Sequence, residues 1–117
     1  MTSLVAAVDF MIADLKELEY DGQPLRVTPR LEDVQPPCVW VALESIDHLS
    51  AVGEMTLRLF LIAPAMDEYR ALKVLGPLLD QVLTVVSPTE ATTVVGISPT
   101  NQLRDLAALR VTTTVVT

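Results

Sequence analysis

The residue types that most often carry chemistry are scarce here, because the 117 residues include one histidine and one cysteine. His48 follows Asp47 directly, and neighbours on an extended chain point to opposite faces, so a catalytic dyad is disfavoured. A zinc site needs three or four protein ligands, which one histidine and one cysteine do not supply. Cys38 opens the apolar run Cys38-Val39-Trp40-Val41, so we expect a buried small hydrophobic residue rather than a nucleophile.

Other signatures of catalysis and cofactor binding are also missing from the sequence. Gly53, Gly76 and Gly96 are isolated, so they do not form a glycine-rich phosphate loop. Asp67-Glu68 precedes a periodic apolar segment, where negative charge favours a helix N-terminus. No loop has the alternating acidic residues of a calcium site. We therefore expect a protein that is not an enzyme, with no catalytic residues, cofactor or metal, which works by what it binds.

The chain is both acidic and apolar. A net charge of −7 repels phosphate backbones and anionic lipid, so gripping nucleic acid is disfavoured as a primary role. Hydrophobic residues make up 50% of the chain and the mean hydropathy is +0.43, so we expect some apolar surface to lie at subunit interfaces. The longest apolar stretch, residues 59–66, contains Pro64 and is far shorter than the ~20 residues of a membrane span.

Two segments have the 3.6-residue apolar period of amphipathic helices. In residues 4–18 the predicted core stripe is Leu4, Val8, Met11, Leu15 and Leu18. In residues 67–86 the predicted apolar face is Leu72, Leu75, Leu79, Val82, Leu83 and Val86. Gly76-Pro77 interrupts the second segment, and Pro77 has no backbone N–H to donate, so this helix is expected to kink or split.

Extended segments separate and follow these helices. The best strand is residues 54–63, where Met55, Leu57, Leu59 and Leu61 face one way and Glu54, Thr56 and Arg58 the other, until Phe60 and Ile62 break the alternation. The other predicted strands are 25–28 (an edge strand), 38–43, 92–97 and 107–116. The predicted fold is one α+β domain over residues 1–117, with two helices packed on a mixed, mostly antiparallel sheet of four or five strands.

The polar segment at residues 44–53 is predicted to be a hairpin loop between two well-defined strands. It is the best candidate for a contact with a neighbouring subunit or along a ring axis. Within it, Ile46 and Leu49 would supply apolar anchors, and Asp47 and His48 would supply orientation. An ordinary solvated hairpin loop is the alternative interpretation of the same residues.

Several motifs follow one another along the whole chain. The first are an N-terminal helix leading to Arg-Val-Thr-Pro-Arg at 26–30, Gln-Pro-Pro-Cys-Val-Trp-Val at 35–41, and an alternating strand that ends at Ala63-Pro64. The second helix opens with Asp-Glu-Tyr-Arg-Ala-Leu at 67–72, and the chain ends near Leu-Arg-Val-Thr-Thr-Thr-Val at 109–115. In this order, these features resemble the tail terminator proteins of long-tailed bacteriophages.

This resemblance implies a structural protein of the virion, at the junction of tail and neck and made in the host cytoplasm. Such proteins form a ring of six subunits on the last ring of the tail tube, stop tube polymerisation and meet the head-completion proteins of the neck. The implied partners are the chain itself, the tail tube protein and a head-completion protein, with DNA passing through the lumen without specific binding and no membrane. A head-closure or other ring-forming neck or tube protein is the alternative, as is a small cytosolic ligand-binding or enzymatic α+β domain.

Overall fold

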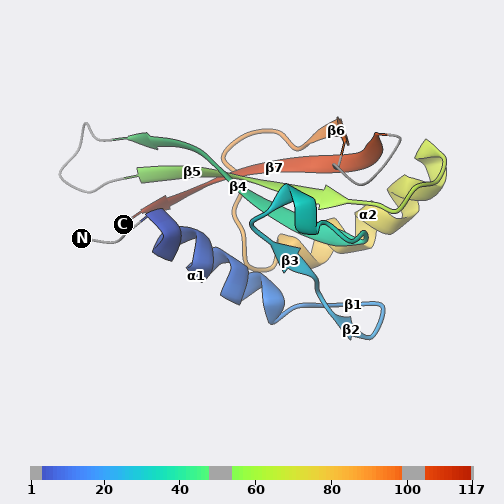
Figure 1. The fold of residues 1–117 in the computed structure, drawn as a ribbon, viewed down its shortest axis with the longest axis horizontal. Coiled ribbons are helices and arrows are strands. Elements are labelled where there is room, and N and C mark those ends of the chain that lie inside the picture. Colours follow the sequence, from blue (N-terminus) through green and yellow to red (C-terminus); the bar gives the residue numbers. More distant parts are fainter. Residues whose placement is uncertain (1–3, 48–53, 99–104, 117) are drawn as a thin grey trace.

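A computed structural model describes residues 4–47, 54–98 and 105–116 of the chain. It contains two α-helices and a five-stranded sheet, together with a small two-stranded sheet (Figure 1). The helices are α1 (Leu4–Lys16) and α2 (Glu68–Val82), and one 3-10 turn is η1 (Leu31–Asp33). The strands are β1 (Glu19–Tyr20), β2 (Gln23–Pro24), β3 (Val27–Thr28), β4 (Cys38–Asp47), β5 (Glu54–Ile62), β6 (Thr93–Ile97) and β7 (Leu106–Val116). The predicted α+β class is confirmed.

The large sheet has the strand order β3-β4-β5-β7-β6. Only the short β3–β4 pair is parallel, and the other three pairs are antiparallel. The predicted mixed, mostly antiparallel sheet is therefore confirmed, as is the prediction of an edge strand near Val27. The long central strand β5 pairs along its whole length with β4 on one side and β7 on the other.

The main core lies between one face of this sheet and the two helices, which cover the same side (Figure 1). Period-2 alternation on β5 puts Met55, Leu57, Leu59 and Leu61 on the covered face, and all four are buried as predicted. Leu15 of α1 and Leu75 of α2 are fully buried in the core cluster that includes Leu57 to Leu61 of this face. Apolar burial on this scale supplies most of the favourable free energy of folding.

The opposite face of the sheet carries a smaller apolar cluster. It contains Val34, Cys38, Ile62, Ile97, Leu106 and Ala108. The rings of Trp40 and Phe60, which are directly opposite across β4 and β5, stack with centroids 4.8 Å apart. The segment that enters β4 includes a cis peptide bond between Pro36 and Pro37. This second cluster explains why the strand at 38–43 is nearly all apolar, since both of its faces are covered.

Between α1 and β3 the chain forms a hairpin that the sequence interpretation missed. The predicted helix extended to residue 18, whereas α1 ends at Lys16, and β1 then pairs with β2 around Asp21-Gly22. Both turn residues have positive φ, 54° for Asp21 and 74° for Gly22, the conformation that Asp-Gly favours in two-residue hairpin turns. The strands have two residues each, too few for an alternating pattern to show.

Helix α2 begins after Asp67, whose side chain accepts a hydrogen bond from the backbone N–H of Arg70 at 2.9 Å, an ordinary N-cap. The helix does not split at Gly76-Pro77, because it runs without interruption from Glu68 to Val82 with Pro77 inside it, and a kink at Pro77 stays a prediction. Packing of the helix on the sheet outweighs the one backbone hydrogen bond that a proline cannot donate.

The predicted core face of α2 is also wrong in part. The buried residues are Ala71, Leu75, Leu78 and Val82, followed after the helix by Val86. Leu72 and Leu83, assigned to the core from the sequence, are each 42% exposed, and Leu79 is only partly buried. The small residue Ala71 marks the side that approaches the sheet, and a search for large apolar residues overlooks it.

No helix in the described part of the chain has the length and apolar character that crossing a membrane requires.

Candidate functional site

The residues predicted to form an interface lie at the end of β4. Ile46 and Asp47 are its last two residues and are opposite Met55 and Glu54 of β5. His48 and Leu49 lie outside the described residues. The prediction that the loop begins at Glu44 is therefore wrong, because residues 44–47 belong to the strand.

A bulge in β4 accounts for this difference. Leu43 is opposite Leu57 and Ser45 is opposite Thr56, so Glu44 is the extra residue where the register shifts. Pairing with the nine-residue strand β5 then continues to Asp47 despite the weak strand propensity of Glu, Ser and Asp. The result is a long β4–β5 pair whose far end lies away from α2, on the left in Figure 1.

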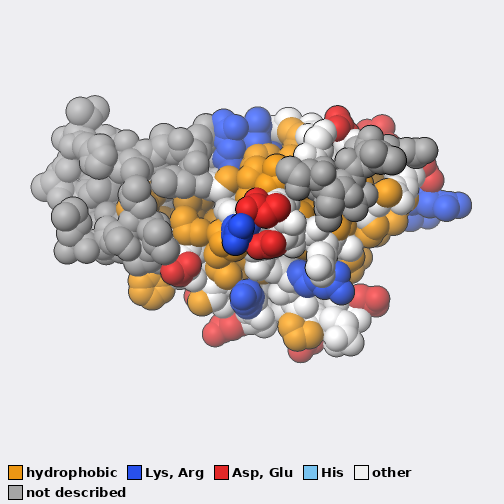
Figure 2. Space-filling view, in the orientation of Figure 1, with side chains coloured by type: hydrophobic (Ala, Val, Ile, Leu, Met, Phe, Trp, Pro, Cys, Tyr) orange, Lys and Arg blue, Asp and Glu red, His pale blue; other side chains and the backbone are white. Residues whose placement is uncertain are grey.

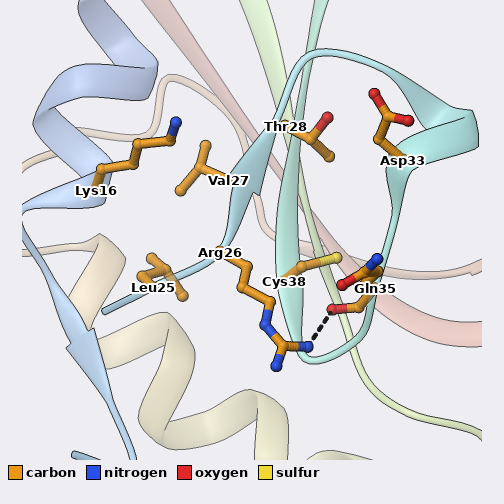
Figure 3. A pocket seen from close by; sticks show the side chains of 8 residues that line it. All are labelled: Lys16, Leu25, Arg26, Val27, Thr28, Asp33, Gln35 and Cys38. Carbon is orange, nitrogen blue, oxygen red and sulfur yellow. Dashed lines mark hydrogen bonds between the residues drawn. The ribbon is translucent and has the colours of Figure 1, made fainter. Parts of the chain in front are cut away.

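A pocket of about 300 Å³ lies on another part of the molecule, where α1 ends beside β3 and the start of β4 (Figure 3). Its lining residues are Lys16, Leu25, Arg26, Val27, Thr28, Asp33, Gln35 and Cys38. Leu25, Val27 and Cys38 are buried and give it an apolar floor, whereas the charged side chains around them are exposed. Sequence interpretation did not identify this pocket, because its residues come from four separate elements.

The polar groups around the pocket are engaged with their own neighbours. The guanidinium of Arg26 donates from Nη1 to the backbone carbonyl oxygen of Gln35 at 3.3 Å. Asp33 lies 3.6 Å from Nε of Arg30, whose Nη2 also donates to Glu32 at 2.7 Å. The hydrogen bond from Arg30, together with its charge, lowers the pKa of the Glu32 carboxyl. The Arg26–Gln35 hydrogen bond joins the segment before β3 to the segment before β4, whereas the Arg30 contacts lie within the η1 turn and its N-cap.

Cys38 carries the only thiol in the pocket lining. Burial raises the pKa of its thiol to about 11, an effect larger than the opposing influence of the Gln35 backbone hydrogen bond and the Arg26 charge. The thiol is therefore protonated at neutral pH, and a protonated thiol is neither a nucleophile nor a metal ligand. The predicted burial of Cys38 is confirmed.

We expect Cys38 to be unreactive toward a thiol reagent such as Ellman's reagent in native protein at pH 7.5. Unfolding in guanidinium chloride should expose one reactive thiol per chain, because it removes the burial that keeps the sulfur protonated and covered. A Cys38→Ala variant is the blank. Rapid, stoichiometric reaction of the native protein at neutral pH would contradict this account of the pocket.

The described residues do not include any group of three or more His, Cys, Asp and Glu side chains that could hold a metal ion. Large apolar side chains are instead exposed at several places. They are Phe10, Met66, Tyr69, Leu72, Leu83, Val85 and Val94. Figure 2 shows apolar side chains at separate places on one face, with acidic and basic side chains between them.

The strongest exposures occur on three separate elements. Phe10 of α1 and Tyr69 of α2 are each 69% exposed, and Val94 of β6 is 52% exposed. In the described sheet β6 pairs only with β7, so its other edge has no neighbouring strand there. An edge strand of this kind is a ready template for pairing with another chain.

No family model, curated protein or solved structure matches the chain.

Proposed function

We propose that this protein is a structural component of a bacteriophage virion that forms a ring of six subunits at the head-proximal end of the tail tube. The ring stops tube polymerisation and joins the tail to the head-completion proteins of the neck. The proposal rests on the resemblance along the chain to tail terminator proteins. The observation that best supports it is the exposure of large apolar side chains on α1, α2 and β6.

A cyclic ring needs two different surfaces on each subunit, because one surface contacts the preceding subunit and the other contacts the following subunit. Phe10 on α1 and Val94 on the β6 edge lie on separate elements, which are well apart in Figure 1. Isolated exposed apolar residues are common in monomers, but side chains this large and this exposed on three elements favour self-association. The 50% hydrophobic composition agrees with this interpretation.

The long β4–β5 pair supports the proposed contact at the end of β4. Its end carries Ile46 and Asp47 away from the α2 side of the molecule. A paired strand holds its terminal residues more firmly than a free loop does, so this end can present a defined surface to a neighbour or to the tube. Ile46 is the apolar anchor proposed for this contact, with Asp47 and the two residues after it.

The acidic balance of the chain suits a conduit for DNA. A net charge of −7 opposes binding of the phosphate backbone, so DNA can pass through the ring without being retained.

Removing the gene from a phage that carries it tests this function. Tails assembled without the protein are expected to vary in length and to fail to join heads, and supplying the protein from a plasmid should restore both properties. Electron microscopy of the particles gives both readouts. Tails of uniform, normal length that join heads in the absence of the protein would overturn the proposal.

A further inference from the structure

Helix α2 has a second apolar stripe beside the one that faces the core. The core stripe is Ala71, Leu75, Leu78 and Val82. The second stripe is Tyr69, Leu72, Gly76, Leu79 and Leu83, with steps of three, four, three and four residues. That spacing is the heptad pattern with which two helices pack along each other. Tyr69 is 69% exposed and Leu72 and Leu83 are each 42% exposed, so much of this stripe faces solvent in the single chain.

Gly76 lies at the middle of the stripe and leaves it open to close approach. A Cβ atom placed there would meet no other atom within 4 Å. A glycine inside a helix costs roughly 1 kcal/mol relative to alanine, so its presence without a local packing reason is notable. At a helix–helix contact, by contrast, a residue without a side chain lets the two backbones come close.

The charged residues beside the stripe would pair with those of a second, antiparallel copy of the helix. Lys73 and Asp80 flank it on the same side, two helical turns apart, and Nζ of Lys73 lies 4.7 Å from the centre of the Tyr69 ring. The midpoint between them falls at Gly76-Pro77. When two copies of α2 run antiparallel about that midpoint, each Lys73 is level with Asp80 of the other copy. A parallel pair would instead place identical charges at the same level.

We propose that α2 packs against α2 of a second copy of this chain as an antiparallel, two-fold symmetric pair. Gly76 of each copy lies near the two-fold axis, and Tyr69 and Leu72 of one copy meet Leu79 and Leu83 of the other. Each pair contains the Lys73–Asp80 contact twice. A two-fold contact closes on itself and cannot alone build a ring of six, so this interaction goes beyond the proposed ring and joins two subunits or two rings.

The contact is expected to be weak. A helix of 15 residues is about 22 Å long, so the stripe covers less than the roughly 800 Å² per partner that stable interfaces bury. Association should therefore depend on concentration in the free protein. It should strengthen when several pairs form at once between assembled subunits.

Charge reversal tests the antiparallel arrangement. Lys73→Glu places two carboxylates together twice in each pair, and Asp80→Lys does the same with two ammonium groups. Each single variant should weaken the two-fold association about tenfold, and the double variant Lys73→Glu/Asp80→Lys should restore it. Sedimentation analysis over a wide concentration range gives the association constants, and circular dichroism checks that all variants are folded. Equal association in wild type and both single variants would overturn the proposal, as would a double variant that stays as weak as the singles.

A disulfide test locates the two-fold axis. In a Cys38→Ala background, Gly76→Cys should give a covalent dimer on mild oxidation, because the two introduced thiols meet near the axis. Gln81→Cys, which lies on the exposed side of α2 away from the stripe, is the matched control and should remain monomeric on a non-reducing gel. Equal cross-linking at both positions, or none at Gly76→Cys, would contradict the arrangement.

These outcomes are separable from those of the ring. Suppose that the protein forms dimers that the single charge reversals weaken and the double reversal restores, but never assembles into six subunits. That result would support the α2 pair and count against the proposed ring. Suppose instead that rings of six form, and that their mass and concentration dependence are the same in wild type and in the Lys73 and Asp80 variants. That result would support the ring and overturn the α2 pair.

Discussion

Replacing Leu15 or Leu57 with aspartate is expected to abolish cooperative folding. Both side chains are fully buried, one on α1 and one on β5, and both belong to the core between the helices and the sheet. Each substitution removes apolar burial and places a carboxyl group where it has no solvent, at a cost of several kcal/mol. Domains of this size have an unfolding free energy of only about 5–15 kcal/mol, so either substitution removes a large part of the stability.

Ala13→Asp is the matched control for Leu15→Asp. Ala13 lies on the same helix but is exposed, so the same new side chain costs only its lower helix propensity, about 0.7 kcal/mol. Thermal unfolding followed by circular dichroism should show a transition for Ala13→Asp and none for Leu15→Asp or Leu57→Asp. Transitions close to wild type for both core variants would mean that the assigned faces of α1 and β5 are inverted.

Leu75→Ala and Leu72→Ala should differ sharply, although both residues are leucines on α2. Leu75 is fully buried, so its truncation leaves a cavity and should lower the free energy of unfolding by about 2–5 kcal/mol. Leu72 is 42% exposed, so its truncation should cost less than about 1 kcal/mol. The corresponding change in melting temperature is roughly 10 °C or more for Leu75→Ala and a few degrees at most for Leu72→Ala.

Chemical denaturation of the two variants at low protein concentration measures this difference without any contribution from self-association. A larger loss of unfolding free energy for Leu72→Ala than for Leu75→Ala would mean that Leu72 faces the core, as the sequence predicts. It would also remove the basis for a second, solvent-facing stripe on α2.

The most regular parts of the fold could be predicted from the sequence because local pattern and burial agree there. On β5 every second residue from Met55 to Leu61 is apolar, and each is buried. On α1 Leu15 of the predicted stripe is fully buried, and Val8 and Met11 are partly buried against the core. In these segments the pleat of a strand or the turn of a helix fixes the face that each residue occupies, independently of the rest of the chain.

The parts that were mispredicted depend on contacts distant in sequence. Helix α2 has apolar residues on two adjacent faces, so its periodicity is compatible with either face in the core. The sheet selects the face with the small residue Ala71. Similarly, β4 continues past Leu43 because β5 pairs with it across a bulge, and residue propensities alone end the strand earlier. The Asp21-Gly22 turn did have a sequence signal, and its short flanking strands hid it.

The candidate interface was only partly accessible from the sequence. The sequence predicts a loop at Ile46 and Asp47, whereas these residues end the strand β4. The exposed residues Phe10, Tyr69 and Val94 were not singled out, because exposure depends on which face each element turns toward the core. An apolar composition leads us to expect an interface, and only the fold shows which elements expose apolar side chains.

The central claim, that this chain assembles as a ring, is tested most directly by native mass measurement of the purified protein combined with electron microscopy, alone and on assembled tail tubes. The account predicts particles of six subunits with a central opening, seated at one end of the tube. Protein that remains monomeric at every concentration and never caps a tube end would contradict it.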